Sequence, residues 1–285
     1  MLELLMSANT EKSVINLLPA PSNPNNWISQ MGMCVSENKD SIYFAGGIGT
    51  NPQYNRSVMR YDILKRGYQN LPDLPDIFTM SNWVQLWHHN NKLYVYRANN
   101  WAVLDLLSLK WSILPTPTNL TYFSSYGGVT FNNNGRLLVY GAPAGTGFRN
   151  TLSEYFPETN MVKLITTNVN VNKFTYPAAT ILNDYLYVSG GSVDKLFSCN
   201  LTTNIWESVT TPIIHTTKCL SGYGDKIYLM GTDELKMDVI TYDIVNKVYG
   251  SAPKFNRNLV NTVMVTIDNM VYAMTRGELS SYLLE

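Results

Sequence analysis

Histidines are the side chains with which this sequence could most readily bind a metal ion. The 285 residues contain three, with His88 and His89 side by side and His215 far along the chain. A metal site needs several His, Cys or carboxylate ligands that converge on one point. Because neighbouring residues of a strand point to opposite sides, His88 and His89 are not expected to ligate one ion together. The sequence therefore predicts no metal site.

Sequence motifs for phosphate binding and nucleophilic catalysis are also missing. Residues 141–147 are glycine-rich but lack the Lys-Ser or Lys-Thr pair that completes a phosphate-binding loop, so a surface loop is expected. Neither Gly-x-Ser-x-Gly nor His-Glu-x-x-His occurs in the sequence. We therefore expect no cofactor and no enzymatic activity.

Composition and charge exclude further classes of protein. Lys plus Arg and Asp plus Glu both number 21, so no net field favours nucleic acid or anionic lipid. The three cysteines, Cys34, Cys199 and Cys219, are an odd number without paired spacing, as in proteins of a reducing compartment. No run approaches the ~20 apolar residues of a membrane span, and the N-terminus lacks a signal-peptide pattern. A cytoplasmic, monomeric protein without nucleic-acid or membrane partners is predicted.

The elements that would position any site recur along the chain. A short apolar strand that ends in small residues or glycine appears six times, with starts 41 to 51 residues apart. The copies occupy residues 42–47, 93–98, 137–142, 186–191, 227–232 and 271–276. This spacing is typical of a propeller blade, which has four strands in about 40–50 residues.

Each copy lies within a predicted four-strand unit. A β-rich run and a turn of Asn, Asp or Gly precede it, which indicates a hairpin. A third strand follows, and then a fourth strand that carries an aromatic residue at Tyr68, Trp111, Trp206 or Tyr249. An aromatic that recurs at the blade period is expected to pack between blades.

The two ends of the chain supply complementary parts of one blade. Residues 2–21 contain a turn, a strand near Val14 and a proline-bearing exit, whereas residues 279–285 read as a third strand without a fourth. Pairing the strand near Val14 with the strand near Tyr282 would complete the sixth blade. A ring closed in this way leaves no exposed sheet edge.

These copies resemble the kelch repeat, an apolar strand ending in Gly-Gly, then a Tyr-Asp strand, then a spaced Trp. Only Gly46-Gly47 and Gly190-Gly191 keep the full diglycine. The resemblance covers the whole chain, is closest to the kelch domains of BTB-kelch proteins, and extends to poxviral kelch proteins. It implies an all-β fold, a six-bladed kelch β-propeller closed by pairing of the N- and C-terminal strands. The expected single domain, 1–285, divides into blades at 28–75, 76–118, 119–168, 169–212, 213–253, and 254–285 plus 1–22.

The resemblance also implies a binding face, because kelch modules bind partners through the loops between second and third strands and the loops between blades. Arginines and aromatics carry much of the binding energy at protein interfaces. Within these loops we expect partner-binding roles for Arg56, Arg97, Trp101, Phe148, Arg149, Phe174, Arg257 and Arg276. Several arginines at one mouth favour an acidic protein or peptide. As loop residues, Arg97 and Arg276 are expected to be replaceable without loss of stability.

The predicted function is non-enzymatic protein recognition. The resemblance implies that the protein is a substrate receptor for a cullin-based ubiquitin ligase. An actin-associated scaffold is an alternative. A sugar- or small-molecule-processing propeller enzyme is the alternative from another class, with Asp62, Asp105 and Asp243 as candidate carboxylates. The other interpretation of these aspartates is structural, because Asp commonly accepts hydrogen bonds from the turn that follows it.

Overall fold

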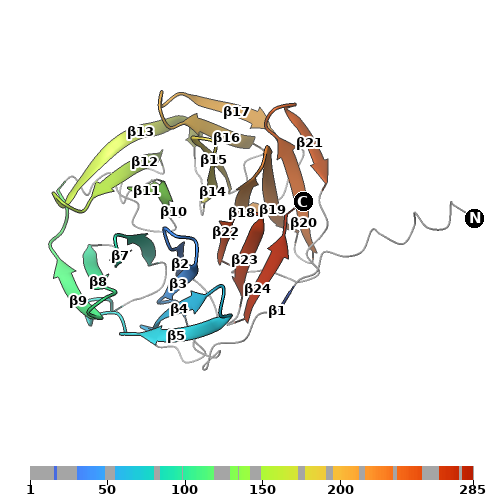
Figure 1. Ribbon diagram of the computed structural model, residues 1–285. Coiled ribbons are helices and arrows are strands. Elements are labelled where there is room, and N and C mark those ends of the chain that lie inside the picture. The colour runs from blue at the N-terminus through green and yellow to red at the C-terminus, as the bar shows by residue number, and fades with distance from the viewer. Residues whose placement is uncertain are drawn as a thin grey trace, which may run out of the picture.

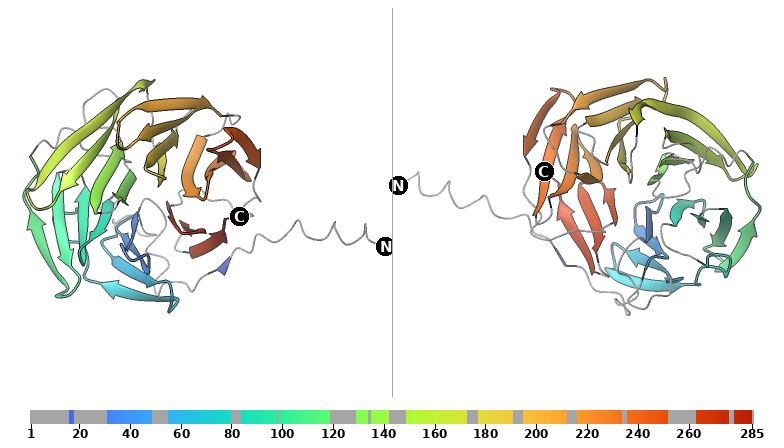
Figure 2. Two further views of the ribbon diagram at one scale, coloured as in Figure 1. Left: turned by 45° about the horizontal axis from the view of Figure 1, so that its top comes forward. Right: turned by 180° about the vertical axis from the view of Figure 1, so that it is seen from behind.

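The computed structural model describes the greater part of the chain (Figures 1 and 2). The described residues are 16–17, 31–48, 55–79, 84–97, 99–118, 129–133, 135–141, 149–172, 177–190, 195–211, 216–233, 236–251, 263–275 and 278–284.

These residues form six antiparallel sheets of four strands each, which we call blades 1 to 6. Blade 1 comprises β2 (Gly32–Val35), β3 (Ser41–Ala45), β4 (Val58–Asp62) and β5 (Gly67–Leu71), and blade 2 comprises β6 (Gln85–His89), β7 (Lys92–Arg97), β8 (Asn100–Asp105) and β9 (Lys110–Leu114). Blade 3 comprises β10 (Val129–Asn133), β11 (Arg136–Gly141), β12 (Arg149–Phe156) and β13 (Met161–Asn172), and blade 4 comprises β14 (Pro177–Leu182), β15 (Tyr185–Gly190), β16 (Lys195–Asn200) and β17 (Trp206–Thr210). Blade 5 comprises β18 (Thr216–Tyr223), β19 (Lys226–Asp233), β20 (Lys236–Asp243) and β21 (Val248–Ser251), and blade 6 comprises β22 (Val263–Ile267), β23 (Met270–Thr275), β24 (Glu278–Leu283) and β1 (Asn16–Leu17).

The first strands of the blades contact one another in a closed ring. β2 contacts β6 and β22, β10 contacts β6 and β14, and β18 contacts β14 and β22. Figure 1 shows these strands around the centre and β5, β9, β13, β17 and β21 at the rim. The predicted all-β, six-bladed propeller is thereby confirmed.

Burial along the strands follows from this arrangement. A second strand lies inside its sheet and has a neighbouring blade on both faces, so all five residues of β3 are buried. The rim strand β9 has no buried residue. The repeated apolar runs of the sequence are thus the second strands, which explains why they do not alternate with polar residues.

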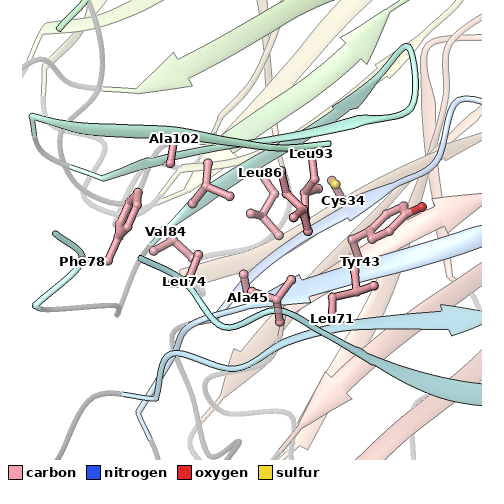
Figure 3. Close-up of a cluster of buried hydrophobic side chains, with 13 residues drawn as sticks. Cys34, Tyr43, Ala45, Leu71, Leu74, Phe78, Val84, Leu86, Leu93 and Ala102 are labelled. Carbon is pink, nitrogen blue, oxygen red and sulfur yellow. The ribbon is translucent and has the colours of Figure 1, made fainter. Parts of the chain in front are cut away.

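Apolar clusters fill the spaces between blades. Between blades 1 and 2, Tyr43 and Ala45 of β3 pack with Leu86 of β6 and Leu93 of β7, and Phe78 from the connection between the blades is fully buried (Figure 3). Corresponding clusters join blade 1 to 6, blade 2 to 3, blade 3 to 4 and blade 4 to 5. Each of these clusters of described residues draws on two neighbouring blades, so the blades depend on one another for burial.

Rim aromatics also tie neighbouring blades with hydrogen bonds. Trp111 Nε1 of blade 2 donates to the Pro72 carbonyl of blade 1 at 3.1 Å. Trp206 Nε1 of blade 4 donates to Thr166 Oγ1 of blade 3 at 3.3 Å. These contacts agree with the structural interpretation of the recurrent aromatic residues.

Blade 6 takes its fourth strand from the other end of the sequence. β1 pairs with β24 through Asn16 opposite Ser281 and Leu17 opposite Ser280. The sequence predicts this pairing near Val14 and Tyr282; Val14 itself lies outside the described residues, and the described pairing is two to three positions further along the chain. In blade 3, β13 extends to Asn172, past the predicted blade boundary at 168.

The close packing of the first strands predicts that alanine substitution destabilises the protein at Gly32 but not at Gly67. A Cβ at Gly32 of β2 would lie 2.5 Å from the backbone oxygen of Val84 in blade 2, so Gly32→Ala should force the first strands apart. We expect a loss of about 1–3 kcal/mol in the free energy of unfolding, as for other overpacked sites.

Gly67→Ala is the matched control, because the nearest atom to its Cβ lies 3.9 Å away. Urea unfolding of both variants checks the prediction. Equal stability of Gly32→Ala and the parent protein would show that the blades do not approach as closely as described.

Candidate binding face

Because the strands of each blade are antiparallel, the connections between strands lie alternately at the two ends of the propeller. Connections between second and third strands and those between blades lie at one end, here called the loop face; its described parts include 46–48, 55–57, 72–79, 99 and 115–118. The other connections form the opposite end, here called the turn face; its described parts include 36–40, 63–66, 90–91, 106–109 and 244–247. The loops predicted to bind a partner therefore share one end of the molecule.

Arg56 joins the two kinds of loop in blade 1. Its Nε donates to the carbonyl of Leu74 at 2.8 Å, and the Leu74 N–H donates back to the Arg56 carbonyl at 2.8 Å. The guanidinium also pairs with Asp76, and the side chains of Arg56 and Asp76 are 40% and 91% exposed. Arg56 thus holds the connection that leads to blade 2 while part of its charge faces solvent.

Asn100 makes a corresponding contact from blade 2. Its Nδ2 donates to the carbonyl of Ile77 at 2.6 Å. The connection between blades 1 and 2 is therefore hydrogen-bonded on one side to the second-to-third-strand connection of blade 1 and on the other side to the first residue of β8 in blade 2. The sequence placed Asn100 and Asp76 in the expected loops but gave no reason to single them out, because both act through residues about twenty positions away.

Arg97 and Trp101 differ from the expectation of exposed loop residues. The two-residue connection in blade 2 leaves Arg97 at the end of β7 and Trp101 inside β8, and they are only 6% and 1% exposed. The Trp101 ring packs against Tyr96 and Tyr155 with centroid distances of 4.4 and 4.6 Å. Arg97 is therefore not an exposed loop residue, because β7 and β8 continue almost to the turn, and the partner-binding roles of Arg97 and Trp101 stay predictions.

The other predicted residues are placed only in part. Arg149 begins β12, opposite Asn172, so the chain there is strand and not loop. Phe148, Phe174, Arg257 and Arg276 lie outside the described residues. Their roles in partner binding stay predictions.

The aspartates of the repeat act as acceptors in turns. Asp105 Oδ1 accepts from the backbone N–H groups of Ser108 and Leu107 at 2.8 and 3.1 Å, and from Ser108 Oγ at 2.9 Å. The N–H of Ser108 is the main cause of a pKa below the usual range for this carboxyl. Asp243 accepts in the same way from Asn246 and Val245.

The corresponding positions of two more blades repeat this contact. Asp62 accepts from the Lys65 N–H, which lowers the pKa of Asp62, and in blade 4 the neutral Asn200 accepts from Thr202 and Thr203. An amide can replace the carboxylate here because the turn needs only an acceptor oxygen. These turns lie on the turn face, at the rim.

Within the described residues, no three His, Cys, Asp or Glu side chains are arranged to hold a metal ion. The same part of the chain has no helix of the length and apolarity that crossing a membrane requires.

Comparisons with known proteins agree on the fold. No protein-family model and no curated protein matches the chain. Among solved structures 874 chains match, including the structure of YjhT, with a TM-score of 0.70 over 93% of this chain and 95% of that one at 14% identity. Identity this low shows the fold alone. The chain is a six-bladed β-propeller.

The burial of Arg97 changes the expected effect of its substitution. Arg97→Ala removes a long buried side chain and its packing, so the free energy of unfolding should fall by about 1–3 kcal/mol. Thermal and urea unfolding measure this loss.

Lys110→Ala on the exposed part of β9 is the control and should stay within about 0.5 kcal/mol of the parent. If Arg97→Ala were as stable as Lys110→Ala, the guanidinium would have to lie in solvent after all.

Proposed function

We propose that this propeller is a non-enzymatic recognition module that captures a partner protein on its loop face. The observation that carries the proposal is the pair of contacts from Arg56 to Leu74 and from Asn100 to Ile77. They join a loop of blade 1, the beginning of β8 in blade 2 and the connection between the two blades into one continuous surface. Binding residues of folded domains commonly lie on such loops, held by a rigid scaffold.

The exposed pair of Arg56 and Asp76 favours a partner that carries acidic groups. Surface ion pairs contribute only about 0–1 kcal/mol, so a partner carboxylate can take the place of Asp76 at little cost. An arginine that binds a carboxylate with two parallel hydrogen bonds adds directional specificity. The face then recognises an acidic segment of a protein.

The finer assignment rests on the kelch resemblance. It suggests a substrate receptor of a cullin-based ubiquitin ligase, with an actin-associated scaffold as the alternative. An enzyme is less well supported, because Asp62, Asp105 and Asp243 each serve a rim turn. Their carboxylates lie in turns at the rim of the turn face and not together at the centre of the ring.

Site-specific cross-linking tests which face binds. Asn99 and Leu107 are exposed and belong to the same blade, the first at the loop face and the second, 81% exposed, at the turn face. Replacing each in turn by a photoreactive phenylalanine analogue and irradiating cells should capture the partner from position 99 and not from position 107.

Mass spectrometry of the captured protein separates the finer assignments. Capture of a substrate of a cullin complex would support the assignment as a substrate receptor. Capture of actin would support the assignment as an actin-associated scaffold. Capture that is equal or stronger from position 107 would contradict binding at the loop face.

A further inference from the structure

One residue of blade 1, Glu37, makes three polar contacts with the end of β6 in blade 2. Its Oε2 accepts from the Asn90 N–H at 2.9 Å, and its Oε1 lies 2.6 Å from His89 Nδ1. Its own backbone N–H donates to His88 Nδ1 at 3.2 Å. These four residues, Glu37, His88, His89 and Asn90, are here called the inner clamp. They lie on the turn face, opposite the proposed binding surface.

The hydrogen bond from Glu37 defines the protonation state of His88. Because Nδ1 accepts an N–H, it carries no proton, and the ring is neutral. The ring is buried and stacks on Tyr43, with centroids 5.3 Å apart and planes 10° from parallel. Burial is the largest cause of a lowered pKa for His88.

The groups around His88 act in opposite directions. The acids Glu37 and Asp40 raise its pKa, and His89 and Arg60 lower it. Asp40 is itself 4.0 Å from Arg60, which weakens its pull on a proton. Burial raises the pKa of Tyr43 to about 12 and raises that of the Cys34 thiol further, so both stay neutral. Among the described residues, the titratable and charged side chains that act on the ring or pack against it include Cys34, Glu37, Asp40, Tyr43 and Arg60 of blade 1 and His89 of blade 2.

We propose that the inner clamp is a proton-operated contact that joins blades 1 and 2 at neutral pH and releases in mild acid. A proton taken up from solvent at His88 Nδ1 would place an N–H against the Glu37 N–H, and this hydrogen bond is lost. The ring must then turn toward the Glu37 carboxylate, whose Oε2 lies 3.8 Å from Nδ1. That movement disturbs the carboxylate that also holds Asn90 and His89.

The direction of the pH effect follows from the lowered pKa. A histidine in an unfolded chain, or one released from the clamp, has a pKa near 6.5, and the pKa of His88 in the folded protein is lower. The clamp therefore contributes its full stabilisation to the contact between blades 1 and 2 above about pH 6.5. Its contribution is lost as the pH falls from there toward the folded pKa. The effect is local to blade 2, because Lys39 of the same turn is bonded to Asp268 of blade 6 at 2.7 Å, independently of histidine.

Amide hydrogen exchange tests the clamp directly. Protection factors of the Glu37 and Asn90 amides, corrected for intrinsic exchange, should fall between pH 7.5 and 5.5, by at most about tenfold, because pH 5.5 is one unit below the ordinary histidine pKa. His88→Gln keeps an acceptor oxygen without a titrating group, so its protection should not change with pH. His89→Gln, the matched control, should retain the fall because it leaves His88 in place.

A second measurement uses the unmodified protein, so it does not depend on the folding of a variant. The ¹⁵N shift of His88 Nδ1 should report an acceptor at neutral pH, and its titration midpoint should lie below 6.5, at the pH where the loss of Glu37 protection levels off. Constant protection in the parent, an equal fall in His88→Gln, or a His88 midpoint at or above 6.5 would overturn the proposal.

Discussion

Each blade of this protein has two apolar faces, and neither is buried until a neighbouring blade covers it. This requirement forces a ring, because an open row would leave one apolar face exposed at each end. The structure meets the requirement with an unbroken circuit of first strands, in which β2 contacts both β6 and β22. At Gly32 the approach is so close that a methyl group does not fit.

Polar contacts between blades then fix the two ends of the ring. At the loop face, Arg56 and Asn100 hold the connection between blades 1 and 2 from both sides. At the turn face, Glu37 reaches the histidines of blade 2, and Lys39 reaches Asp268 of blade 6. The apolar interfaces supply cohesion, and these hydrogen bonds hold the connection between blades 1 and 2 and the turn at residues 36–40 in place. A recognition surface built from loops of several blades depends on both.

The features that the sequence predicted were those that repeat. Six apolar second strands at one period indicated the blades, since a fully buried strand needs an uninterrupted apolar run. The turn role of Asp62, Asp105 and Asp243 was also accessible, because it depends on neighbours two or three residues away. Local patterns thus gave the fold and one of the two interpretations of its carboxylates.

The features that the sequence did not predict depend on contacts between blades. His88 and His89 point in different directions from one strand, yet both meet Glu37, which comes 51 and 52 positions earlier. The burial of Arg97 and Trp101 depends on the length of the turn between β7 and β8, and an arginine followed by small and polar residues resembles an exposed loop. Composition does not distinguish these cases.

The central claim is that the ring is one cooperative unit whose last blade is completed by β1. Thermal unfolding of a chain that lacks residues 1–21 tests it most directly. Removal of β1 takes away the pairing with Ser280 and Ser281 and leaves an edge at β24. The account predicts a Tm lower by several degrees, on the order of 5 °C, with less cooperative unfolding or aggregation. A monomeric truncated protein with an unchanged Tm and an equally sharp transition would contradict it.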